Sequence, residues 1–327
     1  MQIEIWHGAR QRVGHLGNTQ ADFNLMGQLK DHESVDHLYY RVNGENAAVL
    51  GIGSAPNGFG DGRRLARSGH FNADIPIANL CDGDNHIDVV AVNDSGEETT
   101  ARVIVEKYTG SHLLPCTIRW SAVANPQDVG QYVDGHWAIG PHGLRTQHTG
   151  YERIFLLGSD TWDDYQITAP VTIHAVDPLL GPNSGDNGLG LVLRFAGHAA
   201  KDYSSNTVDQ PQWRYRPFGA LAGLRWKDGP DMPPQKQFYR GDGNERKNFG
   251  ECAVMEGKTY VFKAACKRIG PSASTYCCAV WPADEDEPSA WDWQVEQQDE
   301  RALHGGVALL AHHVNASFGD IEIVRLA

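Results

Sequence analysis

The end of the chain carries the clearest strand pattern in the sequence. It begins with Gly305-Gly306-Val307-Ala308-Leu309-Leu310-Ala311 and continues, after four residues, with Ala316-Ser317-Phe318-Gly319-Asp320-Ile321-Glu322-Ile323. Short apolar runs bounded by glycine, followed by an alternation of apolar and polar residues, are typical of β-strands. The pattern therefore predicts a buried strand over 306–314 and a final strand over 321–326.

Upstream of this ending, similar apolar blocks continue as far back as Cys116. They predict strands at Ile154 to Leu157, Tyr165 to Ala175, Leu189 to Phe195, Tyr260 to Arg268 and Thr275 to Trp281. Helical periodicity is nearly absent, and the two segments able to form short helices are 125–130 and 291–303. About a dozen strands over roughly 210 residues is the pattern of a double-sheet jelly roll.

The first part of the chain divides into about seven shorter blocks of the same kind. The turn pairs Asn43-Gly44, Asp82-Gly83 and Ser95-Gly96 separate several of them. Seven short strands in about a hundred residues are typical of an immunoglobulin or fibronectin-like sandwich. We therefore expect an all-β chain with an Ig-like β-sandwich over 1–110, followed by a jelly-roll domain over 111–327.

Two stretches resemble known families. Val280-Trp281-Pro282-Ala283 and Glu287-Pro288-Ser289-Ala290-Trp291, together with the ending quoted above, look like the ending of laminin-G-like and 3-keto-disaccharide-hydrolase-like domains. Those domains belong to the concanavalin A-like lectin/glucanase superfamily. The stretch 84–96 resembles a hairpin that closes many bacterial Ig-like modules. The C-terminal pattern departs at Ala279, where a basic residue is expected, and at Gly319, which replaces an Asp. The resemblance implies a scaffold that hosts hydrolases, lyases and plain lectins.

Composition restricts the partners that the chain can bind. The net charge of −13 argues against a nucleic-acid backbone, which needs clustered Lys and Arg. A neutral glycan is the easier partner, and an acidic sugar would require a local basic groove that overrides the overall field. No run approaches the roughly 18 consecutive apolar residues of a membrane span, so we expect no membrane partner.

The sequence leaves the cellular compartment and the pairing of the cysteines open. Met1 leads directly into a strand-like segment, so we expect a cytoplasmic protein, or a secreted or periplasmic one whose signal peptide has been removed. Six cysteines in 327 residues do not form a disulfide framework. Buried free thiols are favoured over a pair between Cys266 and the adjacent Cys277 or Cys278.

Strand parity predicts where a binding surface lies, because successive side chains point to opposite faces of a sheet. The leucines and the phenylalanine of 189–195 share one face, which leaves Arg194 on the other face and His198 just beyond the strand. The same parity turns His174 outward from its own strand. We expect Arg194 and His174 to share a polar surface that holds sugar hydroxyls, with tryptophans beside it.

Further candidates come from isolated polar residues and from tryptophans in polar loops. Histidine can abstract a proton while Arg and Lys bind a carboxylate, and Glu152, just before a strand, is among the most plausible isolated acids. The predicted catalytic residues are Arg194, His174, His198, His312 and Glu152. The predicted substrate-binding residues are Gln166, Trp213, Trp226, Lys263 and Trp291.

The reaction itself is not determined by any motif. Retaining glucanases of this scaffold carry E-x-D-x-x-E on one strand face, and no such motif occurs here. We expect a protein that binds and cleaves a polysaccharide or oligosaccharide, as a glycoside hydrolase or a polysaccharide lyase. The alternative is a non-catalytic lectin-like, adhesion or structural module. No cofactor is required, although Asp186 and Asn187, within the polar loop 183–187, could hold a structural calcium ion.

Overall fold

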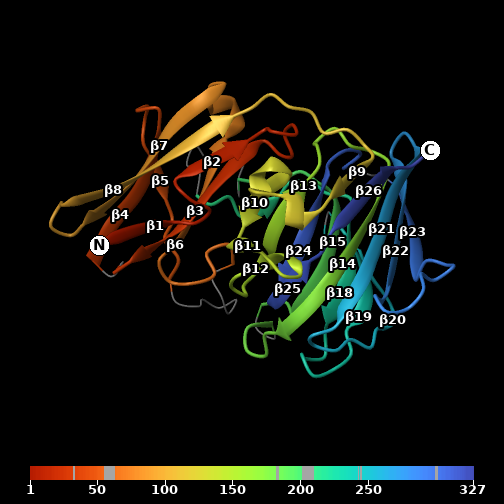
Figure 1. Ribbon diagram of the computed structural model, residues 1–327. Helices are drawn as coiled ribbons and strands as arrows, with labels where there is room; N and C mark the ends of the chain where they lie inside the picture. Colours follow the sequence, from red (N-terminus) through yellow and green to blue (C-terminus); the bar gives the residue numbers. More distant parts are fainter. Residues whose placement is uncertain are drawn as a thin grey trace.

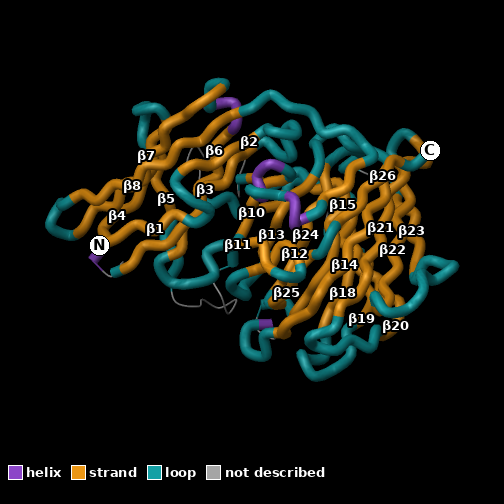
Figure 2. Tube along the Cα trace, viewed as in Figure 1, coloured by secondary structure: helices purple, strands orange, loops and turns teal. Residues whose placement is uncertain are grey.

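The computed structural model describes residues 1–31, 34–54, 63–181, 184–200, 210–241, 243, 245–298 and 301–327, and all counts below refer to these ranges. Strands dominate the chain, as the tube in Figure 2 shows, so the all-β prediction is confirmed. The helical elements are three short 3₁₀ turns, η2 (Ile77–Asn79), η3 (Trp120–Ala122) and η4 (Pro126–Asp128). None of the described helices is long and apolar enough to cross a membrane.

The strands up to residue 107 form two sheets that pack face to face. The smaller sheet has the order β1 (Gln2–Ile5), β3 (Asp22–Lys30) and β6 (His70–Pro76). The larger sheet has the order β2 (Arg10–Val13), β8 (Glu98–Lys107), β7 (Gly83–Asn93), β4 (Val35–Val42) and β5 (Ala48–Leu50). Alternate residues of both sheets, such as Leu25, Phe71, Val89 and Val103, are buried in one shared core. That the fold is Ig-like stays a prediction.

From Cys116 onward the strands form two larger sheets. One has the order β10 (Gly130–Asp134), β13 (Arg153–Leu157), β24 (Gly306–His312), β15 (Asn187–Phe195), β18 (Ala220–Trp226), β19 (Gln235–Arg240) and β20 (Arg246–Glu251). The other contains β11 (Trp137–Gly140), β12 (Gly143–Thr146), β25 (Val314–Phe318), β14 (Tyr165–Val176), β21 (Thr259–Gly270), β22 (Ala273–Pro282) and β23 (Trp293–Gln297), with β26 (Ile321–Arg325) and β9 (Cys116–Ile118) at its side. A short pair, β16 (His198–Ala199) and β17 (Arg214–Tyr215), lies outside both. We call the first the seven-stranded sheet and the second the nine-stranded sheet.

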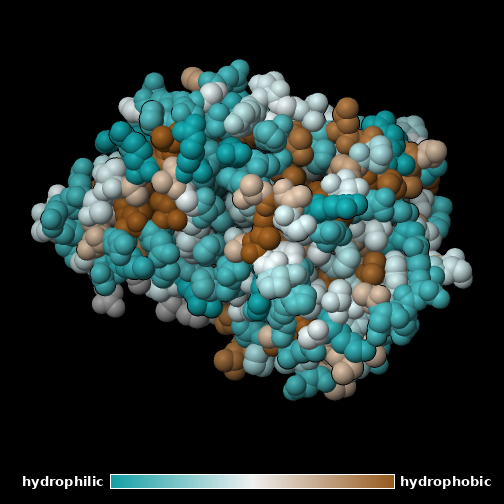
Figure 3. All heavy atoms as spheres, in the orientation of Figure 1, coloured by the Kyte–Doolittle hydropathy of each residue, from teal (hydrophilic) through white to brown (hydrophobic). Residues whose placement is uncertain are grey.

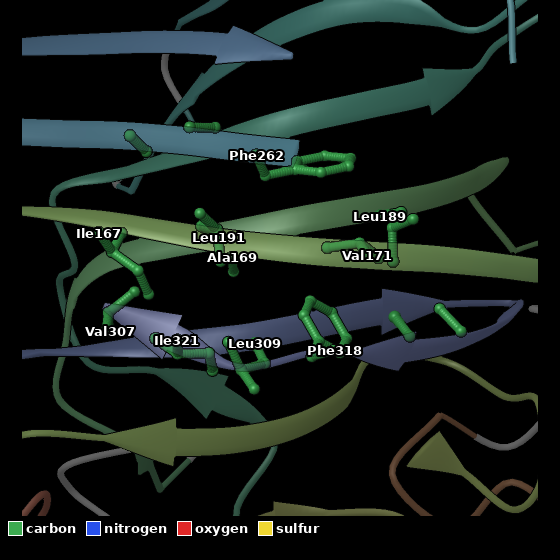
Figure 4. Packing of buried hydrophobic residues seen from close by; sticks show 14 of the residues in the cluster. Ile167, Ala169, Val171, Leu189, Leu191, Phe262, Val307, Leu309, Phe318 and Ile321 are labelled. Atoms are coloured by element: carbon green, nitrogen blue, oxygen red, sulfur yellow. The ribbon is translucent and has the colours of Figure 1, made fainter. Parts of the chain in front are cut away.

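The inner faces of these two sheets meet in the main core of the molecule. Figure 4 shows Ile167, Ala169 and Val171 of β14 beside Leu189 and Leu191 of β15. All five are buried, as strand parity predicts for the apolar face of each strand. Burying such aliphatic side chains stabilises the fold by about 1.5–3 kcal/mol each. The predicted two-sheet sandwich is therefore confirmed by the packing.

Two local predictions have different outcomes. The segment 125–130 forms η4, and Asn125 caps it by accepting a hydrogen bond from the backbone N–H of Gln127. The helix predicted within 291–303 is wrong, because Trp293–Gln297 is strand β23. Its residues alternate between buried and exposed, which is the period of a strand and not of a helix. All six cysteines, each within the described ranges, are free.

The two groups of strands meet along a seam. Figure 1 shows β1–β8, coloured red to orange, beside the yellow-to-blue strands of the larger sandwich. Trp6 and Met26 enter the main core, and Arg12 Nη1 lies 2.5 Å from Asp128 Oδ1 across the seam. The face seen in Figure 3 carries hydrophilic residues over most of both groups, with small hydrophobic groups between them.

Candidate functional site

A cavity of about 440 Å³ lies on the outer face of the seven-stranded sheet, away from the main core. Cross-strand register places three rows of side chains on its floor. The first row holds His312 and Arg225, the second holds Ile154, Leu310 and Gln237, and the third holds Val192, Leu221 and Tyr239. Loops between strands form most of the wall and carry Arg63, Tyr151, Glu152 and Trp213, and the short strand β16 adds His198.

Two glycines lower the middle of the floor. Gly190 and Gly223 pair with each other between Leu310 and Gln237, so this part of the row has no side chains. A Cβ added at Gly190 would lie 2.4 Å from the carbonyl oxygen of Ala222, which is too close for any side chain. The glycine pair therefore keeps the centre of the floor at backbone level.

Glu152 is the carboxylate that lines this cavity. It precedes β13 with a positive φ of 49°, a strained conformation for a residue with a side chain. Its side chain is 19 % exposed, and its Oε2 atom has no hydrogen-bond partner among the described residues. Burial raises the pKa of Glu152 to about 8, with a smaller contribution from the negative charge of Asp134. Glu152 is therefore largely protonated at neutral pH and can donate a proton.

His312 faces Glu152 from the end of β24. Its Nδ1 atom lies 4.0 Å from Oε1 of Glu152, and its Nε2 atom lies 2.9 Å from the carbonyl oxygen of Ser184. Burial, reinforced by His313, holds the pKa of His312 well below its usual range. The ring is therefore neutral, with Nε2–H donating to the carbonyl and the Nδ1 lone pair facing Glu152. The contact is between two neutral groups and not an ion pair.

His198 enters the cavity wall from β16, just after β15. Gly197 has a positive φ of 91°, and this turn directs His198 toward the end of β10. There His198 Nε2 lies 2.7 Å from Oδ2 of the fully buried Asp134. Burial would raise the pKa of Asp134, but the charge of Arg64, with the hydrogen bond from His198, outweighs this effect and lowers that pKa. A carboxylate only accepts, so the proton lies on Nε2 in neutral His198 and leaves Nδ1 as a base.

The Nδ1 atom of His198 is the candidate for this role. It is buried, and within the described ranges it has no hydrogen-bond partner. His198 lines the cavity and Asp134 fixes the orientation of its ring, so the pair is a candidate for proton transfer with a bound molecule that reaches Nδ1. A histidine that a carboxylate holds through one ring nitrogen, with the other ring nitrogen unpaired, is an arrangement used in general-base catalysis.

The first group of strands supplies the cation behind this pair. Arg64, which precedes β6, donates from Nε to Asp134 Oδ1 at 2.6 Å. Its two terminal nitrogens donate to both oxygens of Asp74 at 2.9 and 2.8 Å. All four side chains, from Asp74 through Arg64 and Asp134 to His198, are at most 3 % exposed. A buried, hydrogen-bonded chain therefore connects β6 with the cavity wall.

Arg225 is a floor residue with an open hydrogen-bonding capacity. Its Nε atom lies 3.7 Å from Asp186 Oδ2, which is longer than a hydrogen bond, and no hydrogen bond joins it to a described residue. The side chain is 16 % exposed. Ideal Cβ atoms at Gly185 and Gly188 would lie 3.2 Å from its terminal nitrogens, so these glycines provide the space for the guanidinium.

Four of the residues predicted from the sequence line the cavity. They are Glu152, His198, Trp213 and His312. Arg194 does not lie there, and its predicted place on a sheet surface is wrong. It is fully buried, and its Nη1 atom donates to Ser274 Oγ at 2.6 Å and to Ala302 O at 3.3 Å.

A β-bulge explains this error. The register between β15 and β24 shifts at Arg194, whose φ is 54°. The extra residue reverses the parity of the strand. Leu193 packs in the main core, whereas Phe195 lies on the outer face beside the cavity. Arg194 therefore points inward.

The predicted shared surface of Arg194 and His174 does not exist, because their strands belong to different sheets. His174 lies on β14 of the nine-stranded sheet and bonds Ser317 Oγ through Nε2 at 2.7 Å. The same sheet carries Gln166, and also Lys263, whose Nζ atom lies 5.2 Å from the ring centre of Trp291. Trp226 is 2 % exposed and belongs to the main core.

The predicted calcium ligands show no metal cluster. Asp186 lies near Arg225, and Asn187 donates from Nδ2 to the carbonyl oxygens of Asp177 and His313. Asn183 of the same loop lies outside the described residues. Over the part of the chain that is described, no group of three or more His, Cys, Asp or Glu side chains could hold a metal ion.

The sequence patterns do not predict that Arg225, Tyr151 and Tyr239 line the cavity, or that Arg64 contributes to it. Parity would have found Arg225, since Ala220, Ala222, Leu224 and Trp226 all face the core and leave Arg225 on the outer face. No local signal marks Arg64, because its partners lie 10 and 70 residues away in sequence.

Comparison with known proteins gives no family assignment. No model of a protein family matches the chain, and no curated protein does. Solved structures with a related arrangement include the exoplasmic/lumenal domain of VIP36 in its Ca²⁺/Man3GlcNAc-bound form, with 10 % identity and a TM-score of 0.39 over 64 % of this chain and 88 % of that one. The xylan beta-1,4-xylosidase from Bacillus halodurans C-125 has 9 % identity and a TM-score of 0.39 over 92 % of this chain and 70 % of that one. At these scores the likeness assigns no function.

Proposed function

We propose that the chain is a carbohydrate-active enzyme that binds a glycan in the cavity and cleaves it by proton transfer. The observation that supports this most strongly is the presence of two proton-transfer groups in one cavity. Glu152 is a protonated acid, and His198 is a base oriented by Asp134. Groups of this kind, with unmet hydrogen-bonding capacity beside a cavity, are typical of catalytic sites.

The lining also suits a sugar. Trp213, Tyr151 and Tyr239 offer aromatic faces on which a pyranose ring can stack. Gln237, on the floor, offers an amide for sugar hydroxyls. The backbone-level centre of the floor at Gly190 and Gly223 leaves space for the ring between these groups. In this arrangement Glu152 would protonate the departing oxygen, while His198 would accept a proton from water or from the sugar.

A second candidate function is binding without cleavage. Most glycosidases use a pair of carboxylates. Among the described lining residues Glu152 is the one carboxylate, and this favours binding without cleavage. A histidine base can replace the second carboxylate, so we favour the enzyme.

Incubation with a panel of polysaccharides tests the proposal. New reducing ends would report hydrolysis, and new ultraviolet absorbance of an unsaturated product would report elimination, so either one supports cleavage. We expect Glu152→Gln and His198→Gln to lower kcat by about 10²–10⁴-fold while glycan affinity changes little. Glu45→Gln and His86→Gln, at exposed positions of the first group of strands, are matched controls and should leave kcat unchanged. Glycan binding without any product after prolonged incubation would contradict cleavage and support the second candidate.

A further inference from the structure

The charge of the cavity is opposite to the charge of the molecule. The chain carries a net charge of −13, yet five arginines line the cavity, and these are Arg63, Arg64, Arg214, Arg225 and Arg246. Of the described lining residues, Glu152 is the one that carries a carboxylate. Buried Arg64 is neutralised by its two aspartates, but the others still give the cavity a positive field.

The protonation of Glu152 preserves this field. A pKa of about 8 leaves the carboxyl group mostly uncharged at neutral pH, so it does not cancel the charge of Arg225. A protonated carboxyl group is also a hydrogen-bond donor. The floor therefore presents a guanidinium, and the wall presents an O–H group.

Arg225 has the position and the free capacity to bind an anion. Its nearest acidic partner, Asp186, lies at 3.7 Å, and its terminal nitrogens lie beside Gly185 and Gly188, which have no side chain to fill the space there. A mostly buried guanidinium forms stronger hydrogen bonds to an anion than an exposed one, because less water competes. Arg246, stacked 4.7 Å above the ring centre of Tyr239, adds a second guanidinium at the edge of the floor.

We infer that the cavity takes an acidic glycan, whose carboxylate or sulfate group is bound by Arg225 while its ring stacks on the lining aromatic side chains. This inference rests on the proposed function, since it names the class of glycan. A neutral glycan would leave the guanidinium of Arg225 with Asp186 at 3.7 Å as its charged neighbour and without a hydrogen-bonded anion in the cavity.

Matched pairs of glycans test the inference by isothermal titration calorimetry. Uronate oligosaccharides are compared with the neutral chains made from them by carboxyl reduction, and sulfated galactan oligosaccharides are compared with their desulfated chains. We expect at least one acidic chain to bind about 10- to 100-fold more tightly than its neutral counterpart. A preference within the uronate pair would identify a carboxylate as the bound group, and a preference within the galactan pair would identify a sulfate. Neutral chains that bind as tightly as the acidic ones would overturn the inference but leave the proposed function intact. Failure of every glycan to bind would contradict both.

Substitutions locate the preference within the cavity. Arg225→Gln should reduce the affinity for the acidic chain by about 10- to 100-fold and leave that for the neutral chain nearly unchanged. Arg246→Gln changes an exposed side chain and should likewise weaken binding of the acidic chain more than binding of the neutral chain. Arg102→Gln removes an exposed arginine that pairs with Asp88, far from the cavity in sequence and sheet, and serves as the control. Equal affinity loss for acidic and neutral chains in Arg225→Gln would contradict the assigned role of Arg225.

Discussion

The backbone of Glu152 is held in a conformation that most residues avoid. A positive φ at a residue with a side chain costs about 1–3 kcal/mol and persists only where neighbouring contacts enforce it. Arg153 supplies such contacts, because its guanidinium donates to the carbonyl oxygens of Tyr151 and Arg63. These contacts therefore hold Glu152 at the cavity wall against the strain, and burial there favours its protonated form.

The raised pKa of Glu152 predicts a pH-dependent cost to stability. The carboxyl group titrates at about 8 in the folded chain and near 4.5 in an unfolded one. Between these values the folded state holds a proton that the unfolded state has released, so stability falls as pH rises through this window. Glu152→Gln should remove that loss and increase the free energy of unfolding by about 4 kcal/mol at pH 7.5, but hardly at pH 4.5. Denaturant titrations at both pH values measure the difference, and an equal change at the two would contradict it.

Single residues show how far sequence reasoning reaches. The sequence predicts Glu152 and His198 beside strand ends and His312 within a strand, and the structure places all three around one cavity. Their partners could not be identified in this way. Asp134 meets His198 only because β10 and β16 come together in the fold, 64 residues apart. Burial and pairing, which determine the chemistry, arise from tertiary contacts that no local pattern encodes.

At the scale of elements, the bulge in β15 decides which side chains reach the cavity. Parity predicts the core face of Leu189 and Leu191 correctly, but it fails after Leu193, where one extra residue is inserted. A Cβ at Gly305 would lie 2.5 Å from the backbone carbon of Arg194, so glycine is required opposite the bulge. The Gly305-Gly306 pair was visible in the sequence, but its pairing with the bulge was not.

The inward position of Arg194 predicts a structural role. Arg194→Met should leave Asp163 O, Ser274 and Ala302 O without their donor and lower the free energy of unfolding by about 2–4 kcal/mol. The KM of any glycan substrate should not change, because Arg194 does not line the cavity. Thermal unfolding and steady-state kinetics on one preparation measure both effects. A raised KM with unchanged stability would support the surface position first expected, and Arg102→Met is the control for loss of an exposed arginine.

At the scale of the whole molecule, the seam between the two groups of strands is rich in histidine. The ring of Trp6 lies 4.7 Å from His70 and 5.3 Å from His136, and His7 stacks on Tyr132 at 3.5 Å. Burial lowers the pKa of His7, His70, His136 and His148. The seam therefore depends on these rings being neutral.

This histidine seam predicts a loss of stability in acid. Burial, with a smaller contribution from Arg153, lowers the pKa of His70 to about 3, from 6.5 in an unfolded chain. Between these values the unfolded state binds a proton that the folded state does not, so stability falls as pH decreases below 6.5. His70→Phe should reduce the slope of unfolding free energy against pH by about 1.4 kcal/mol per pH unit between pH 6 and 4. Denaturant titrations across this range measure the slope. His86→Phe, at an exposed position, should leave it unchanged, and an unchanged slope in His70→Phe would refute the prediction.

The hydrogen bonds that join Asp74, Arg64, Asp134 and His198 bear on how the two groups of strands can be recombined between genes. The first group of strands ends at Lys107 and the second begins at Cys116. A genetic exchange between these residues would therefore transmit each group of strands intact. It would nevertheless separate Arg64 from Asp134, and the recipient would inherit a buried carboxylate without its cation. We expect an exchange between diverged genes to preserve the fold when both parents carry this pair. We therefore expect the two parts of the chain to be inherited together, although they form separate sheets.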